Sequence, residues 1–188
     1  MSELPAIVRF GYELGQLQEE RRNGWKRLGV QPESVAEHSV RAAQLAYVMA
    51  CMEGHPNPGD VSAHALFHDI AETRTGDADK VHRQYVDAQE EAAVRDQTAD
   101  LGDAGHAICQ MWLDVDNRAT PAGNIAKDAD YIEMAFRAKE LITQGHPDAQ
   151  LWIDGIRDSL VTDSAKRLLA ALEAADPNEW WKRVCGFA

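Results

Sequence analysis

The stretch HALFHDIAETRTGD, residues 64–77, combines a buried-looking helical run with a cluster of ionisable groups. The apolar run ends at Phe67, His68 and Asp69 follow at once, and Glu72 comes one helical turn later. Side chains three or four residues apart share one face of a helix, so these three are expected to converge. Burying unpaired charge beside an apolar run is costly. A divalent cation would offset that cost, because imidazole nitrogens and carboxylate oxygens are both metal ligands.

The composition of the whole chain predicts one helical domain. Its 188 residues suffice for a single domain, spanning 1–188, and 45% hydrophobic with 27% charged residues is ordinary for a globular protein. Alternating β-branched runs are nearly absent, whereas helical periodicity recurs along the chain. We therefore expect an all-α fold, a bundle of six to eight helices.

Several helix boundaries carry local signals. Ser34 and Glu37 form an S-x-x-E capping box, and Thr120-Pro121 supplies an N-cap and first helical residue. Asp60 is the expected cap of the helix that contains the opening stretch. The helices are expected at 4–21, 35–52, 61–73, 80–99, 103–114, 121–144 and 163–175, with a loop at 21–32 and a docked, tryptophan-bearing turn at the C-terminal end.

The charge of the chain restricts its partners. A net charge of −12 argues against nucleic acid polymers and anionic membrane surfaces, which bind through clustered Lys and Arg. It allows a small anionic substrate if a metal or a few basic groups reverse the field locally. We expect neither a transmembrane helix nor a signal peptide, since no long apolar run occurs. Three scattered cysteines suggest reduced thiols and a cytoplasmic location.

Two other helices could supply further ligands to the same site. His38 shares a helix face with Ala42 and Met49, so it should point inward, either as a metal ligand or as a buried hydrogen-bonded histidine. Asp128 and Asp130 fall within the apolar pattern of a later helix, and periodicity alone favours Asp128. Two imidazoles and two carboxylates from three helices would form a metal site with open positions for water and substrate.

Three segments together carry a resemblance to a known family. PESVAEHS, HALFHDIAETRTGD and AKDADYIEMAFRA, in this order, resemble the HD-domain metal-dependent phosphohydrolases, and most of all the branch of 5′-deoxynucleotidases. The resemblance covers about residues 20–140. It implies a divalent cation (Co, Mn, Fe, Zn, Ni or Mg) held by His38, His68, Asp69 and Asp130. The family pattern K-x-x-D thus selects Asp130, against the periodicity.

The resemblance also implies roles at the reacting centre. Glu72 matches the acid that handles the attacking water, and Asp77 matches a site carboxylate that could accept a hydrogen bond from a 3′-hydroxyl. The implied reaction is hydrolysis of deoxynucleoside 5′-monophosphates to deoxynucleosides and phosphate. Family members are often dimers, so a homodimer is a further implication.

The substrate-binding side departs from the family. Some bacterial members of the nucleotidase branch carry Arg directly before the tryptophan, where this chain has Gly24. Trp25 would then stack beside the sugar or base, or merely anchor its loop. One or more of Lys26, Arg27 and Lys80 would contact the phosphate, although Lys80 also fits a solvated charge at a helix start.

Alternative functions remain compatible with these residues. One is another nucleotide phosphodiesterase or phosphohydrolase of the HD superfamily, and another is a non-catalytic helical module that binds metal or nucleotide. A di-iron oxygenase would need more histidine ligands, for which only His82 and His106 are available. A helical bundle without a metal would require the acidic and imidazole clusters to coincide by chance.

Overall fold

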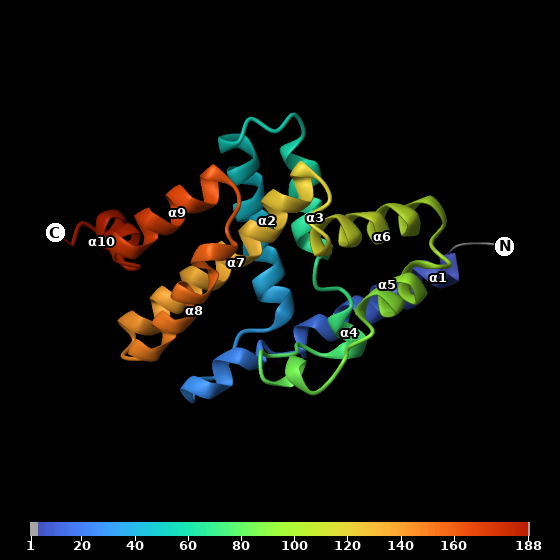
Figure 1. Cartoon of the computed structure of the whole chain (residues 1–188), viewed down its shortest axis with the longest axis horizontal. Helices are drawn as coiled ribbons and strands as arrows, with labels where there is room; N and C mark the ends of the chain where they lie inside the picture. The colour runs from blue at the N-terminus through green and yellow to red at the C-terminus, as the bar shows by residue number, and fades with distance from the viewer. Residues whose placement is uncertain (1–3, 188) are drawn as a thin grey trace.

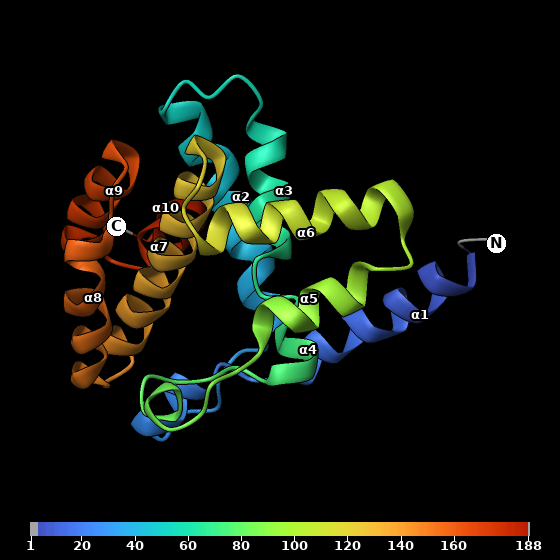
Figure 2. The same cartoon turned by 45° about the vertical axis from the view of Figure 1, so that its right-hand side comes forward.

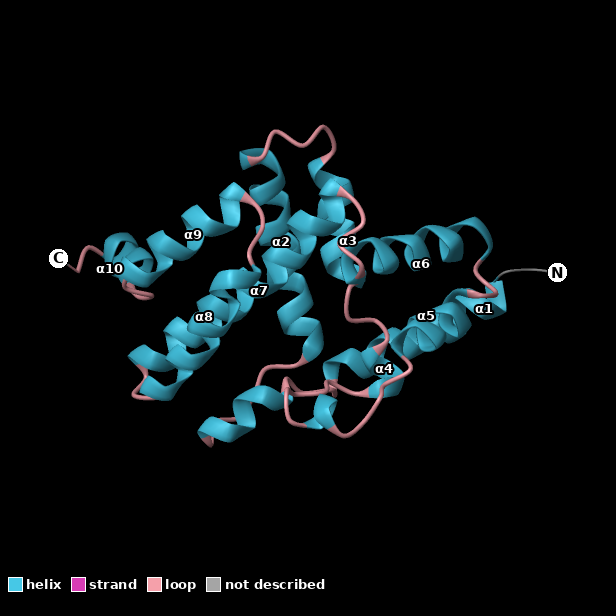
Figure 3. Ribbon diagram, in the orientation of Figure 1, coloured by secondary structure: helices cyan, strands magenta, loops and turns pink. Residues whose placement is uncertain are grey.

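The structure, a computed structural model, describes residues 4–187, and these are helical throughout apart from connecting loops (Figure 3). The described range holds no β-strand, so the predicted all-α fold is confirmed. The α-helices are α1 Leu4–Leu14, α2 Val35–Met52, α3 Pro58–Phe67, α4 Glu72–Thr75, α5 Glu90–Thr98, α6 Gly102–Asp116, α7 Pro121–Thr143, α8 Gln150–Ile156, α9 Asp163–Ala174 and α10 Glu179–Cys185. Five short 3-10 helices lie between them: η1 Gly15–Gln18, η2 Asn23–Leu28, η3 His82–Gln84, η4 Pro147–Ala149 and η5 Arg157–Ser159.

Helices α2, α3 and α7 form the centre of the molecule. In Figures 1 and 2, α1, α5 and α6 lie to the right of this centre, where the N-terminus is marked, and α8, α9 and α10 lie to the left. Small residues on the facing surfaces, among them Ala46, Ala65 and Ala129, are fully buried and let the three helices pack closely. Larger residues such as Met49 and Ile132 fill the space between them. The central helices therefore form a rigid frame for side chains that point inward.

Two helix starts follow the predicted capping. The Ser34 hydroxyl accepts from Glu37 N, and Ser34 N donates to the Glu37 carboxylate at 2.7 Å, which completes the capping box of α2. Thr120 caps α7 by accepting from Gly123 N at 3.0 Å. The predicted cap of α3 is wrong. Asn57 and not Asp60 is the N-cap residue, and Pro58 occupies the first turn.

The helix predicted at 61–73 is interrupted at His68. Helix α3 ends at Phe67, residues 68–71 form turns, and α4 starts at Glu72. Backbone bonds of the i to i+3 type replace the helical pattern here, for example from Glu72 N to the Asp69 carbonyl. The imidazole of His68 instead bonds the Ala65 carbonyl through Nδ1. The His68-Asp69 pair therefore lies in the turn between α3 and α4.

Other boundaries differ from the predictions for local reasons. The helix expected at 80–99 begins only at Glu90, because Asp79 accepts from the backbone of Val81 and His82 and fixes a tight turn. Helix α8 was not expected, and the loop predicted at 21–32 contains η2. The C-terminal turn is a helix, and its tryptophans do not dock, since Trp180 is 69% exposed.

Two further expectations concern thiols and membranes. The cysteines Cys51, Cys109 and Cys185 are free thiols, as expected. Among the helices of residues 4–187, none is both long and apolar enough to cross a bilayer.

The contact between α6 and α7 depends on Gly123. A Cβ atom at this position would lie 2.0 Å from the Asp114 carbonyl oxygen, which belongs to backbone and cannot rotate away. We expect Gly123→Ala to lower the free energy of unfolding by about 3 kcal/mol or more, measured by chemical denaturation. Gly11→Ala is the matched control. Gly11 lies on α1, and a Cβ atom at this position would have no neighbour within 4 Å, so this variant should be neutral or up to about 1 kcal/mol more stable.

Candidate metal centre

Four predicted ligands from three parts of the chain meet at one point. His38 lies on the second turn of α2, His68 and Asp69 lie in the turn after α3, and Asp130 lies on α7. His38, His68 and Asp130 are buried, and one donor atom from each lies within 4.8 Å of the others. Asp69 completes the group, because its Oδ2 is 3.1 Å from His68 Nε2 and 3.6 Å from His38 Nε2.

The spacing of these donor atoms fits a single cation. His38 Nε2 is 3.3 Å from His68 Nε2 and 3.2 Å from Asp130 Oδ1, and His68 Nε2 is 3.7 Å from the same oxygen. Ligands at about 2.1 Å from an ion are separated by about 3.0 Å in octahedral and about 3.4 Å in tetrahedral geometry. Mixed nitrogen and oxygen donors of this kind suit several divalent transition metals.

The two aspartates of α7 have separate roles. Asp130 points toward the histidines, whereas Asp128 is fully buried on another side of the helix. Asp128 Oδ1 accepts from Arg118 at 2.9 Å, and Oδ2 accepts from the backbone N–H groups of Val161 and Thr162. Asp128 therefore ties α7 to the start of α9. Periodicity favoured Asp128 because it detects burial, and burial here serves a structural contact.

Three of the four predicted ligands, His38, His68 and Asp130, are each held by a further group. His68 Nδ1 lies 2.7 Å from the Ala65 carbonyl oxygen, and His38 Nδ1 contacts the Glu133 carboxylate. Lys127 donates to Asp130 Oδ2 at 2.8 Å, which leaves Oδ1 directed at the imidazoles. Such contacts fix the orientation of metal ligands and the histidine tautomers.

Arg22 is a site residue that the sequence did not reveal. Its guanidinium lies 3.2 Å from Asp69, 3.5 Å from Asp77 and 3.9 Å from Asp130. The family pattern directs attention to the residue next to Trp25, but the 3-10 helix η2 brings Arg22, three positions earlier, into the centre. The sequence feature that could have indicated Arg22 is the pair Arg21-Arg22 before Trp25.

Glu72 and Asp77 lie beside the four ligands. Glu72 is only 5% exposed, and its Oε2 has no hydrogen-bond partner among the described groups. Asp77 is fixed by the loop, since Asn23 donates both its backbone N–H and its side-chain amide to it. The structure thus brings both predicted catalytic carboxylates to the centre.

Not all of the predicted substrate-binding residues lie where they could contact a substrate. Trp25 is 3% exposed, stacks on Trp152 at 4.9 Å and donates its indole N–H to Glu33. This is the loop-anchor alternative, and it leaves almost no ring surface for a sugar or base. Lys80 is exposed, its ammonium lies beside Gly155 of α8, and it is not among the residues that line the cavity at Asp77.

Lys26 and Arg27 line a polar cavity that opens from Asp77. The cavity has a volume of about 400 Å³ and is also lined by Asn23, Asp77, Asp79 and His82. Lys26 bonds the Asn23 side chain, and Arg27 bonds Asp79 at 2.9 Å. His82 belongs to this cavity and His106 is exposed, so neither joins the four predicted ligands.

The packed charges displace several pKa values. Burial opposes the charged form of His68, yet Asp69 and Asp130 outweigh it and raise the pKa of His68 to about 10. Burial, Asp69 and Asp77 raise the pKa of Glu72 well above its usual range, against the opposing effect of Arg22. A carboxyl group with a raised pKa is a stronger base than an ordinary carboxylate.

Comparisons with known proteins agree with this geometry. The HD-domain family matches residues 14–171. The 5′-deoxynucleotidase HDDC2 of Danio rerio is 30% identical over 139 residues, which is 71% of this chain and 68% of the relative. The 5′-deoxynucleotidase PM0747 of Pasteurella multocida is 26% identical over 132 residues, 63% of this chain and 67% of the relative. The crystal structure of the genomics protein APC5600 superposes with a TM-score of 0.79 at 32% identity, over 94% of this chain and 99% of that one.

The all-α bundle, the buried His-His-Asp cluster and the match over most of the chain define the class. The protein belongs to the HD-domain metal-dependent phosphohydrolases. Within that family it is similar to proteins named 5′-deoxynucleotidases.

The separate roles of the two aspartates can be tested by substitution. Asp130→Ala should abolish metal retention while the fold persists, measured by elemental analysis and circular dichroism. Asp128→Ala should retain the ability to bind metal but lose about 3–5 kcal/mol of unfolding free energy, since Arg118 loses its buried partner. The opposite result would reverse the assignment of the two aspartates: the Asp128 variant would lose the metal, and a stable Asp130 variant would keep it.

Metal loading should release protons. At pH 7 the metal-free protein carries His68 protonated, because its pKa is raised to about 10. A metal binds only the neutral imidazole, so binding displaces this proton, and affinity should fall by up to about tenfold per pH unit per proton as pH decreases. Calorimetric titration in two buffers of different ionisation enthalpy, at one pH, measures the release. Identical heats in both buffers would contradict it.

Proposed function

We propose that this protein is a metal-dependent phosphomonoesterase that hydrolyses deoxynucleoside 5′-monophosphates to deoxynucleosides and phosphate. The observation that carries the proposal is the buried Glu72 carboxylate, whose Oε2 has no hydrogen-bond partner among the described residues, beside two imidazoles, two aspartates and a guanidinium. A purely structural metal site has no use for a proton-transfer group and an anion-binding group next to it. The similarity to relatives named 5′-deoxynucleotidases supports the choice of substrate.

The metal would be held by His38, His68, Asp69 and Asp130. When bound, it supplies Lewis-acid polarisation of the phosphoryl group and makes water acidic enough to act as a nucleophile. These four side chains would leave room on a divalent ion for water and substrate, as a catalytic centre requires.

Glu72 would transfer the proton in the reaction, first as general base and then as general acid. Its free Oε2 accepts a proton from the attacking water as the new P–O bond forms. The P–O bond to the 5′-oxygen breaks, and Glu72 returns the proton to the departing alkoxide. The raised pKa of Glu72, caused by burial and by Asp69 and Asp77, suits a group that must do both.

Arg22 would bind the phosphate. A guanidinium presents paired N–H donors that match phosphoryl oxygens, and it concentrates positive charge in a chain of net charge −12. Its position between Asp69 and Asp77 places it between the cation ligands and the cavity. Lys127, which is bonded to Asp130, adds a second positive charge at the same side.

Asp77 and the 400 Å³ cavity would receive the nucleoside. The cavity is of a size that small ligands occupy, and its walls offer Asn23, Lys26, Arg27 and His82 as polar contacts. Asp77 lines the cavity and also contacts Arg22 at 3.5 Å, and it can accept a hydrogen bond from a sugar hydroxyl. A preference for deoxyribose would then depend on how closely this wall approaches the sugar.

The proposal is tested by phosphate release from a panel of 5′-deoxynucleotides and 5′-ribonucleotides with Co²⁺, Mn²⁺, Mg²⁺ or no metal. Release from deoxynucleotides in preference to ribonucleotides supports it. Glu72→Gln should retain the metal but reduce kcat by about 100-fold or more, since proton transfer is lost. Asp69→Ala should lose both metal and activity.

Two results would contradict parts of this assignment. A fully active Glu72→Gln variant would remove the proton-transfer role of Glu72. A metal-loaded protein without turnover on any phosphoester would favour the non-catalytic binding module, and turnover of phosphodiesters alone would favour a different HD-type hydrolase.

A further inference from the structure

The two histidines of the centre are supported by different groups. His68 Nδ1 is paired with a neutral backbone carbonyl, that of Ala65, at 2.7 Å. His38 Nδ1 is paired with a carboxylate, Glu133 Oε2. A carboxylate is the stronger acceptor, and it makes the imidazole a better electron donor to a metal than a carbonyl does. The centre is therefore asymmetric in a way that its ligand types alone do not indicate.

Glu133 is fixed by contacts of its own. It is 1% exposed, and its Oε1 accepts from Arg41 Nε at 2.7 Å and from a terminal Arg41 nitrogen at 2.6 Å. This leaves Oε2 for His38. Glu133 follows Asp130 by one turn of α7, so this helix supplies one predicted ligand and supports another.

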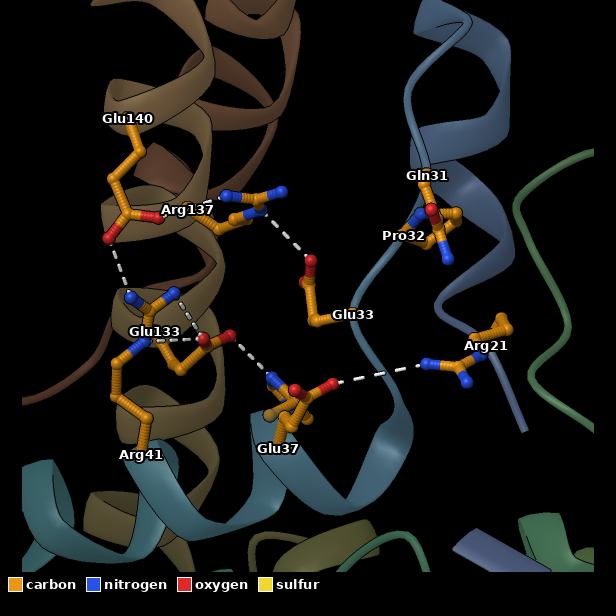
Figure 4. A pocket seen from close by; sticks show the side chains of 10 residues that line it. Arg21, Gln31, Pro32, Glu33, Glu37, Arg41, Glu133, Arg137 and Glu140 are labelled. Atoms are coloured by element: carbon orange, nitrogen blue, oxygen red, sulfur yellow. Dashed lines mark hydrogen bonds and ion pairs between the residues drawn. The ribbon is translucent and has the colours of Figure 1, made fainter. Parts of the chain in front are cut away.

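The contacts continue from Arg41 along a groove. Arg41 bonds Glu140 at 2.6 Å, Glu140 pairs with Arg137 at 3.2 Å, and Arg137 bonds Glu33 at 2.9 Å. Glu33 in turn accepts from the indole of Trp25. Figure 4 shows these alternating charges on the wall of the groove, whose volume is about 530 Å³. The chain of ion pairs links the support of His38 to the loop that carries Arg22.

We propose that Glu133 is a positioning residue for His38, an inference that rests on the metal centre of the proposed function. Glu133 keeps the proton of His38 on Nδ1 and holds the Nε2 lone pair toward the cation. It lies behind the imidazole, opposite the donor atoms, and so acts on the metal through His38 without touching substrate. Its removal should weaken metal binding more than a loss of local packing would.

The direct test is Glu133→Gln, which preserves size and can still accept a hydrogen bond but lacks the negative charge. We expect its Co²⁺ dissociation constant to rise about 10- to 100-fold, with a changed visible Co²⁺ spectrum. The matched control is Glu140→Gln. It makes the same change on the same helix and also removes a partner of Arg41, but it does not contact His38. This control should stay within about twofold of the wild type.

A double variant separates positioning from simple charge pairing. Glu133→Gln leaves Arg41 without its buried partner, and this could disturb α2 by itself. Combining it with Arg41→Gln removes both charges, and thermal unfolding of the metal-free proteins reports whether stability returns. We expect Co²⁺ binding by the double variant to remain about 10- to 100-fold weakened.

The outcomes are distinct. Recovery of wild-type Co²⁺ affinity in the double variant would overturn the positioning role, as would equal affinities of Glu133→Gln and Glu140→Gln. A wild-type protein that binds no Co²⁺ would overturn the metal centre itself, and the proposed function with it.

Discussion

Buried negative charge dominates the centre of this bundle. Asp69, Asp77, Asp130 and Glu72 approach one another in a region that is largely shielded from water, where like charges repel strongly. Arg22 lies among three of these carboxylates and compensates part of the repulsion. Lys127, which donates to Asp130, and the raised pKa of His68, which favours its protonated form, compensate more of it when no metal is bound. A divalent ion held by the two imidazoles and two carboxylates would take over this compensation. The need to compensate these buried carboxylates links the fold to the proposed chemistry.

Helix α7 meets that requirement by separating functions around its circumference. One side presents Asp130 and Glu133 to the histidines, and another presents Asp128 to Arg118 and the start of α9. Ile132 and its neighbours bury the apolar side against α2 and α3. A helix committed to the core on several sides cannot shift without disturbing all of them. The donor geometry is therefore coupled to the packing of the whole bundle.

The loop between η1 and α2 completes the site. It is anchored by the stacking of Trp25 on Trp152 and by the bond from Trp25 to Glu33, and it delivers Arg22 and Asn23 to Asp69 and Asp77. The cavity that begins at Asp77 is bounded by the same loop. Residues that hold substrate in the proposed function thus depend on aromatic packing that takes place outside the site.

The sequence alone determined the all-α class and the capped starts of α2 and α7, and, through the family resemblance, the six histidine and carboxylate residues predicted for the centre. The class and the capped starts arise from periodicity and from contacts within a few residues, which local sequence records directly. Tertiary structure decided the rest. It broke the predicted helix at His68 and buried Trp25, and it brought in Arg22 and Glu133. It also brought Asp130, which the family resemblance selects and periodicity does not, to the histidines, and it gave Asp128 a partner in Arg118. Each of these depends on contacts between residues tens of positions apart, whose energies no local pattern encodes, because burial by itself does not say which partner a buried side chain will meet.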